Sequence, residues 1–136
     1  MSVREAAPQA ETRMVEVVFP QHLNHHGNLF GGHALRMMDT AAFTAATRRA
    51  RRTVMTVAVE GVRFVAPVRH GEIVEMVARV VETGRTSVTV DVEMLAEALL
   101  SGDRRQCGTA RFVLVAVDDD GAPTPIADVE AAPQGD

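Results

Sequence analysis

A loop rich in histidine, asparagine and glycine leads into two adjacent glycines and then into a helical stretch that carries an acid. The loop occupies residues 21–32, the glycines are Gly31 and Gly32, and the acid is Asp39. A helix start presents unpaired backbone N–H groups and a positive dipole end, which together can stabilise an oxyanion. A carboxylate one or two turns further on can activate water. This combination predicts attack of water on a carbonyl group.

Asp39 is the strongest single candidate for a catalytic residue. Aspartate has a poor helix propensity, and here its neighbours are apolar or small, as at Met38, Ala42 and Phe43. Such neighbours favour partial burial, and burial makes a carboxylate a stronger base than it is in water. We therefore predict a catalytic Asp39, against the alternative of a solvent-facing acid on the helix surface.

Polar residues of the loop supply further candidates. Asn24 either forms a turn, as asparagine often does, or uses its amide to orient water or polarise the carbonyl. His25, His26 and His33 do not have a known metal-ligand spacing, so no metal site is predicted. A histidine general base is an alternative to plain loop polarity. His26 is assigned to substrate binding together with the glycine pair.

Arginines that could bind phosphate groups gather at two places. Four of them crowd the end of the helical stretch within residues 48–52, where compensation of the helix dipole is the alternative explanation. A tight turn with a guanidinium and two hydroxyls lies at residues 84–87. A further cation, Arg63, lies on the strand predicted at residues 55–64. The residues predicted to bind such a ligand are Arg63, Gly84, Arg85, Thr86 and Ser87.

The elements that position these residues follow from hydrophobic periodicity. Residues 14–19 predict a strand stopped by Pro20, and residues 33–50 predict a helix, because they contain good helix formers and neither proline nor glycine. The alternation of the following strand changes phase at Glu60-Gly61, which predicts a β-bulge. The four later strands are expected at residues 55–64, 72–83, 88–97 and 105–117.

The predicted order β-α-β-β-β-β describes an α+β domain over residues 13–118, with one long helix and a five-stranded antiparallel sheet. One helix covers a single face of such a sheet, so we expect a second subunit on the other face or on an edge. Residues 1–12 and 119–136 are expected to be flexible ends, because they are polar, small or rich in proline.

Composition excludes several classes of function. The 136 residues, 46% of them hydrophobic, fit one folded domain. The net charge of −4 and the lack of Trp and Tyr argue against nucleic-acid binding. The absence of lysine excludes a lysine Schiff base, and the single cysteine, Cys107, excludes an internal disulfide. Neither a membrane-spanning run nor a signal peptide is recognisable, so a cytoplasmic location is expected.

Several short blocks occur in a fixed order between residues 14 and 117. They are Phe19-Pro20, residues 24–32, Met37-Met38-Asp39, Val62-Arg63-Phe64, Pro67-Val68, Gly71-Glu72 and residues 84–87. This ordered set resembles the hotdog-fold acyl-CoA thioesterases of the bacterial short- to medium-chain type, which are related to cytosolic acyl-CoA hydrolases. The resemblance implies a helix wrapped by an antiparallel sheet, a dimer with one continuous sheet, and a hexamer formed as a trimer of dimers.

The resemblance also implies an activity, the hydrolysis of acyl-CoA to a free acid and coenzyme A at the dimer interface. It makes Asp39 the catalytic acid and Asn24 the catalytic asparagine, from opposite subunits, and the turn at residues 84–87 part of the coenzyme A contact surface. No cofactor is implied, because coenzyme A belongs to substrate and product. Whether Asp39 activates water or attacks the carbonyl to form an anhydride stays open.

Three positions depart from the family pattern, and two other functions stay open. Ala58, Glu60 and Ala66 stand where relatives often have serine, aspartate and histidine, which bears on chain-length preference and rate more than on reaction type. The alternatives are a non-catalytic module that binds acyl-CoA and an acyl-CoA hydratase on the same fold. The loop and Asp39 fit a thioesterase better than the Asp/His pair that is typical of hydratases.

Overall fold

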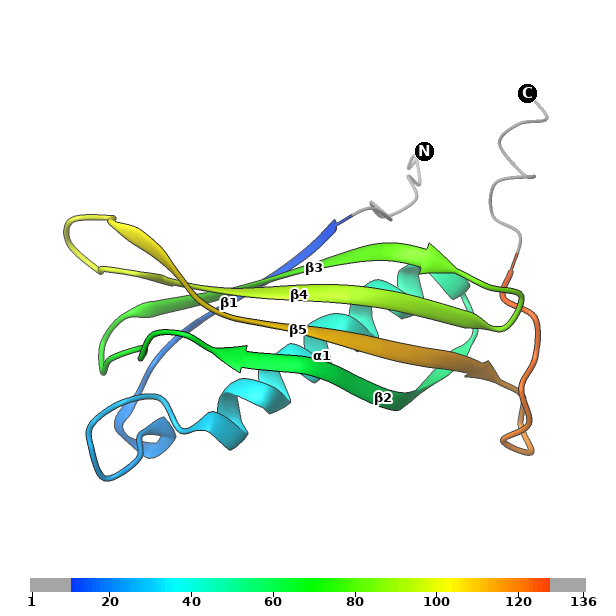
Figure 1. Ribbon diagram of the computed structural model, residues 1–136, viewed down its shortest axis with the longest axis horizontal. Helices are drawn as coiled ribbons and strands as arrows, with labels where there is room; N and C mark the ends of the chain where they lie inside the picture. The colour runs from blue at the N-terminus through cyan, green and yellow to red at the C-terminus, as the bar shows by residue number, and fades with distance from the viewer. Residues whose placement is uncertain (1–10, 128–136) are drawn as a thin grey trace, which may run out of the picture.

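One long helix lies across one face of a five-stranded antiparallel sheet (Figure 1). The computed structural model describes residues 11–127, so residues 1–10 and 128–136 of the predicted flexible ends lie outside the described residues. The elements are β1 (Glu11–Val17), the 3-10 turn η1 (Pro20–His22), α1 (Gly31–Ala50), β2 (Thr53–Phe64), β3 (Ile73–Thr83), β4 (Ser87–Glu97) and β5 (Arg104–Val117). The strand order β1-β3-β4-β5-β2 makes β1 and β2 the edges and confirms the predicted α+β arrangement.

Helix α1 buries a stripe of small and sulfur-containing side chains against the sheet. The buried residues of α1 are Ala34, Met37, Met38, Ala41, Ala42, Ala45, Ala46 and Ala50. Alanine at the closest positions lets the strands approach the helix, and Met76, Val90 and Phe112 fill the space from the sheet side. No helix in the described part of the chain has the length and hydrophobicity that crossing a bilayer requires.

The predicted boundaries hold to within three residues. Strand β1 begins at Glu11, three residues earlier than predicted, because its pairing with β3 extends to Arg79, and it ends at Val17. Residues 11 and 12 therefore belong to the sheet rather than to a flexible end. Helix α1 begins at Gly31 rather than His33, so the two glycines form its first turn instead of preceding it.

Edge strand β2 contains two irregularities in its pairing with β5. The register shifts between Glu60 and Arg63, and Gly61 has a φ of 58°, which confirms the bulge expected from the change of phase. A second shift between Thr56 and Ala58 was not predicted. The pattern of hydrophobic residues gave no sign of it, because more exposed and less exposed residues keep alternating through it.

The segment after β5 is not the untethered end that its composition suggested. Within residues 119–127, the N–H of Ile126 donates to the carbonyl of Arg85 at 3.0 Å, and the N–H of Ala127 donates to the carbonyl of Ala50 at 2.8 Å. These backbone bonds were not predicted, because small residues and prolines are typical of an unpaired chain end. They hold this segment, the β3–β4 turn and the end of α1 together at one end of the molecule (Figure 1).

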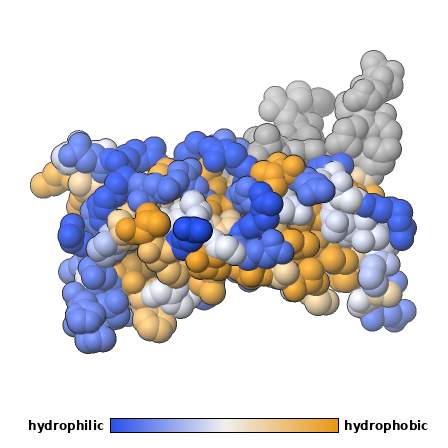
Figure 2. Space-filling view, in the orientation of Figure 1, coloured by the Kyte–Doolittle hydropathy of each residue, from blue (hydrophilic) through white to orange (hydrophobic). Residues whose placement is uncertain are grey.

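The face of the sheet that points away from α1 is polar. Arg111 bonds Asp91 at 2.7 Å, and Arg79 lies 3.7 Å from Glu93. Exposed apolar side chains lie instead along the edge strand, at Met55, Val57, Val59, Val62 and Phe64. Figure 2 shows apolar side chains gathered in the lower middle of the molecule, between more hydrophilic ends. Of the two surfaces considered for a second subunit, the β2 edge is therefore the better fit.

Candidate active site

Asp39 lies two turns into α1 on the side that faces β2, and it is half buried. The hydroxyl of Thr56, on β2, donates a hydrogen bond to Asp39 Oδ1 at 2.8 Å. The other carboxylate oxygen has no hydrogen-bond partner in the described part of the chain. Both residues line a hollow of about 380 Å³ whose walls also include Gly32 and Val59. The carboxylate is thus held on one side and open to a ligand on the other.

Asn24 organises the loop before α1. Its side-chain oxygen accepts hydrogen bonds from the N–H groups of His26 at 2.9 Å and Asn28 at 3.2 Å. The oxygen is therefore occupied, and the amide NH₂ is the group left to donate to a ligand. The ring of His26 is exposed and lies 4.0 Å from the ring of His25. Asn24 thus forms a turn and also presents a donor, which unites the two roles considered for it.

The start of α1 lies beside Asn24. Phe30 caps the helix without a side-chain hydrogen bond, so the N–H groups of Gly31 and Gly32 have no partner among residues 11–127. A Cβ on Gly32 would come within 2.7 Å of the exposed Phe30 ring, which would have to move to admit a side chain there. Gly31 and Asn24 line a second hollow of about 350 Å³. This half of the site offers backbone and amide donors to an anion.

The acid and the donors of one protomer are too far apart to act on the same carbonyl. Seven residues of helix separate Gly32 from Asp39, a rise of about 10 Å. Reacting groups must approach to about 3–3.5 Å. Asn24 and Gly31 line one hollow, while Asp39 and Thr56 line the other, which Gly32 also borders. Within one copy of the chain, the candidate acid and the candidate donors are therefore complementary in chemistry and separate in space.

Comparison with known proteins places the chain in a family. A family model described as "Thioesterase superfamily" matches residues 26–101, more than half of the chain. The chain belongs to the thioesterase superfamily. The acyl-CoA thioester hydrolase YciA of Salmonella typhimurium is 35% identical over 129 residues, which cover 93% of this chain and 97% of the relative. The protein is therefore a thioester hydrolase by family, as the sequence predicted.

Solved structures share the fold of this thioesterase. An apo-hexameric acyl-CoA thioesterase matches with a TM-score of 0.84 at 31% identity, over 93% of this chain and 88% of that chain. An acyl-CoA hydrolase from Staphylococcus aureus, in complex with butyryl coenzyme A, coenzyme A and coenzyme A disulfide, matches with a TM-score of 0.81 at 29% identity, over 93% and 84%. Further structures of the Staphylococcus aureus enzyme carry an alanine in place of an asparagine, an aspartate or a threonine.

Thr56 was not predicted from sequence as a site residue of this thioesterase. The only signal was one hydroxyl in a strand whose neighbours, Met55 and Val57, are apolar. Its contact with Asp39 depends on how β2 lies against α1. That packing joins residues 17 positions apart and cannot be read from periodicity.

The predicted coenzyme A contacts of the thioesterase lie at two ends of the sheet. The N–H of Gly84 donates to the carbonyl of Ser87 at 2.9 Å and closes the predicted turn, which leaves Arg85 exposed. Along β5, the pairing positions of Ser87 and Arg63 are six residues apart, or about 20 Å. One protomer therefore does not bring Arg63 together with the turn.

Two histidines and an acid meet beside the start of α1. One ligand atom from each of Glu16, His22 and His33 lies within 4.8 Å of the others. The rings of His22 and His33 are stacked at 4.1 Å with an interplanar angle of 9°. Parallel rings direct their nitrogen lone pairs side by side rather than toward one point, so this arrangement does not fit tetrahedral coordination of an ion.

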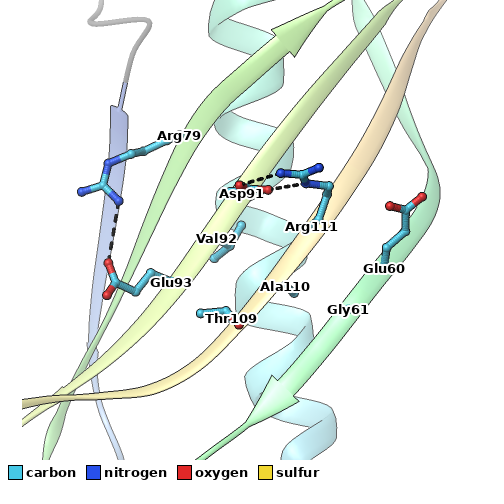
Figure 3. Close-up of a pocket in the computed structure, with 9 residues that line it drawn as sticks. All are labelled: Glu60, Gly61, Arg79, Asp91, Val92, Glu93, Thr109, Ala110 and Arg111. Carbon is cyan, nitrogen blue, oxygen red and sulfur yellow. Dashed lines mark hydrogen bonds and ion pairs between the residues drawn. The ribbon is translucent and has the colours of Figure 1, made fainter.

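A hollow on the outer face of the sheet is a weaker candidate for the active site (Figure 3). It has a volume of about 500 Å³ and is lined mainly by charged side chains of β2, β3, β4 and β5. Arg111 binds both oxygens of Asp91, at 2.7 and 3.0 Å, and Arg79 faces Glu93. The helix start is not among its lining residues, so it lacks a group that would polarise a carbonyl.

Arg105 stabilises the wall that Pro67 forms in the Asn24 hollow. Its guanidinium binds both oxygens of Glu72 at 2.8 Å and donates to the carbonyl of Pro67 at 2.7 Å. Pro67 lines the hollow, so the ion pair positions one wall of the site. Hydrogen bonding to Arg105 lowers the pKa of Glu72 from its ordinary value, and the backbone N–H of Arg69 adds to this effect.

We expect this ion pair to make part of the stability dependent on pH. Because the folded-state pKa of Glu72 is lowered, its contribution is present above the ordinary glutamate value of 4.5 and is lost as pH falls through the folded value. Glu72→Gln should therefore be less stable by on the order of 1 kcal/mol at pH 7, and the gap should narrow on acidification below 4.5. Thermal melts of both proteins between pH 7 and 3 measure this gap. A gap that stays constant with pH would contradict the assignment.

Proposed function

We propose that the protein hydrolyses acyl-CoA thioesters to a carboxylic acid and coenzyme A at sites shared by two protomers. Each site would combine Asp39 and Thr56 of one protomer with Asn24 and the α1 start of the other. The observation that carries this proposal is the separation of the two halves within one protomer. The acid and the carbonyl-polarising donors lie about 10 Å apart along one helix, so they form one hydrolytic site only when two copies meet.

The substituted residues of the Staphylococcus aureus enzyme support the choice of residues. Its substituted asparagine and aspartate are 15 positions apart, and its substituted threonine follows 17 positions after the aspartate. Asn24, Asp39 and Thr56 have the same types and the same spacings in this chain. The structure of the asparagine variant is a complex with coenzyme A. These matches favour the same three side chains as the machinery here.

The exposed edge of β2 supports the assembly. An edge strand with a row of exposed apolar side chains is a template for pairing with another copy. Antiparallel pairing of two β2 strands about a two-fold axis would extend the sheet and make both interface halves identical. We further propose that such dimers form a hexamer, as the hexameric relative does, and that the protein acts in the cytoplasm, the setting of the cytosolic hydrolases it resembles.

The proposed mechanism uses only groups of the protein. The thioester carbonyl oxygen would accept hydrogen bonds from the free N–H groups at the α1 start and from the Asn24 amide, which stabilise the oxyanion. Asp39, oriented by Thr56, would either remove a proton from the attacking water or attack the carbonyl carbon itself. The carbon–sulfur bond then breaks, and the thiolate of coenzyme A leaves without a strong acid catalyst, because a thiol is itself acidic. In the second route a water molecule then hydrolyses the anhydride between the acyl group and Asp39, which releases the carboxylic acid and restores the carboxylate. No step calls for a metal or a cofactor.

We expect the wild-type protein to release free thiol from butyryl-CoA and Thr56→Val to do so more slowly. Valine keeps the shape of threonine but removes the hydrogen bond to the Asp39 carboxylate. The loss of a hydrogen bond to a charged group should lower kcat by about 10- to 100-fold. Release of coenzyme A, followed with a thiol reagent, measures the rate. Thr89→Val, on the outer face of β4, is the matched control and should keep wild-type activity.

Two results would overturn the proposed function. Binding of butyryl-CoA without any thiol release, even at high protein concentration, would favour the non-catalytic acyl-CoA-binding module. Loss of conjugated absorbance from an enoyl-CoA, with no thiol released, would favour the hydratase. Equal activity of Thr56→Val and the wild type would remove Thr56 from the mechanism.

A further inference from the structure

Several arginines of the described residues form ion pairs with carboxylates, among them Arg13, Arg79, Arg104, Arg105 and Arg111. Arg51 and Arg52, just after the last turn of α1, are exposed and have no acidic partner between residues 11 and 127. The Arg52 guanidinium donates only to the carbonyl of Arg51. Two neighbouring positive charges are thus left without a counter-charge.

These two arginines line a hollow further along α1 than the hollow that holds Asp39. The hollow measures about 560 Å³ and is also lined by Phe43, Thr47 and Thr53, the last of which begins β2. It therefore lies between α1 and β2, as does the hollow that holds Asp39. On the helix, Asp39, Phe43, Thr47 and Arg51 follow at intervals of four residues, which places each one turn beyond the last.

The groove wall contains an unsatisfied polar group. The hydroxyl of Thr47 is buried and has no hydrogen-bond partner within the described part of the chain. By contrast, the hydroxyls of Thr40 and Thr44 each donate to the carbonyl four residues earlier, at 3.0 and 2.8 Å. Buried polar groups are nearly always satisfied in folded proteins. An amide-bearing ligand in the groove would supply the missing partner.

Arg51 has an unfavourable backbone conformation. Its φ of 48° makes it the one non-glycine residue with positive φ among residues 11–127. Helices commonly end in this left-handed conformation, but usually with a glycine, because a side chain costs energy there. The backbone of Arg51 closes the helix through its N–H bond to the carbonyl of Thr47, and an arginine where glycine is usual suggests a function for the side chain.

We propose that Arg51 and Arg52 bind the phosphate groups of acyl-CoA, with the pantetheine arm along Phe43 and Thr47 and the thioester at Asp39. This inference rests on the proposed function. Twelve residues separate Asp39 from Arg51, a helical rise of about 18 Å. The roughly 13 bonds from the thioester sulfur to the first phosphorus span about 15 Å at the reach of an extended chain, and the arginine side chain covers the remainder.

Charge supports this direction for the ligand. The helix end carries about half a negative charge, which two full positive charges outweigh. Arg85 lies at the same end, because its carbonyl binds Ile126 while the next residue, Ala127, binds the carbonyl of Ala50. The β3–β4 turn predicted to contact coenzyme A therefore stands close to Arg51. A phosphate at this end would meet cations from two elements.

The test compares two substrates in the assembled protein. With butyryl-CoA, the double variant Arg51→Gln/Arg52→Gln should raise KM by about 10- to 100-fold, the loss expected for charge-assisted hydrogen bonds. With S-butyrylpantetheine, which has the same thioester and no phosphate, KM should change less than about twofold. The control Arg111→Gln removes one positive charge from the outer face and should leave both KM values unchanged. Equal effects of the double variant on both substrates, or on neither, would overturn the proposal.

Two further measurements separate this inference from the proposed function. Titration of coenzyme A into the wild type and the double variant, followed by calorimetry, tests the phosphate site even if no hydrolysis occurs. Equal affinity in the two proteins would overturn the phosphate site and leave the hydrolysis untouched. Arg51→Gly should also weaken coenzyme A binding, yet its melting temperature should be unchanged or higher because glycine relieves the strained conformation. A lower melting temperature with unchanged binding would show that Arg51 is structural.

Discussion

Replacement of Asp39 by asparagine is expected to lower kcat by about a thousandfold or more while the fold and substrate binding persist. Asparagine has the shape of aspartate and can still accept the hydrogen bond from Thr56 at the oxygen that Asp39 uses. It is neither a base nor an acyl-accepting nucleophile, so both routes considered for Asp39 are blocked. Thiol release from butyryl-CoA measures the rate.

The control for this variant is an acid-to-amide change elsewhere. Asp91→Asn, on the outer face of the sheet, removes the same charge from an ion pair with Arg111 and should keep wild-type kcat. The affinity of Asp39→Asn for coenzyme A should stay within a few-fold of the wild type, because the carboxylate acts on the acyl group. Substantial hydrolysis by Asp39→Asn would show that the acid is not part of the chemistry.

The half-buried position of Asp39 on a helix was predictable, because helix propensity and the small size of its neighbours both indicate it. Its helix follows from residue types, and the small neighbours that predict burial belong to the same helix. Asn24 and Gly31 were found by a similar local argument, since a turn residue before a glycine-led helix start creates free donors. Within one helix and the turn before it, the spacing of residues along the sequence determines their relative positions, so these positions can be predicted from the sequence.

Thr56 and the segment after β5 were not predictable, for a different physical reason. Both acquire their role from contacts between elements that are distant in the chain. Thr56 contacts Asp39 only because β2 packs beside α1, and Ile126 is held by the carbonyl of Arg85. No periodicity encodes such contacts. Composition was misleading for this segment, because proline and small residues do not prevent the remaining N–H groups from pairing.

The geometry of one protomer makes a shared site necessary for the proposed chemistry. A helical rise of about 10 Å between Gly32 and Asp39 follows from their spacing alone. No side-chain rotation closes such a gap, because Thr56 holds Asp39 on its own side of the helix. The resemblance assigned Asn24 and Asp39 to opposite subunits, and the two separate hollows give a physical reason for that assignment.

Mixing two inactive variants is therefore expected to restore activity. Asn24→Ala should lose about 10²- to 10³-fold in kcat, as removal of an oxyanion donor does, and Asp39→Asn loses more. In a mixed dimer, one site combines the intact Asp39 of one protomer with the intact Asn24 of the other. Random exchange makes half of the dimers mixed, with one working site in two, so about a quarter of wild-type activity should return.

A control that places both changes in one chain gives the opposite result. When the double variant Asn24→Ala/Asp39→Asn mixes with the wild type, each site of a mixed dimer contains one altered residue. Only the wild-type dimers, about a quarter of the total, remain active, so activity falls below the half expected from dilution. If each protomer held a complete site, the single variants would not rescue each other and the double variant would only dilute the wild type. The two mixtures thus decide between a shared and a self-contained site whatever the absolute rates are.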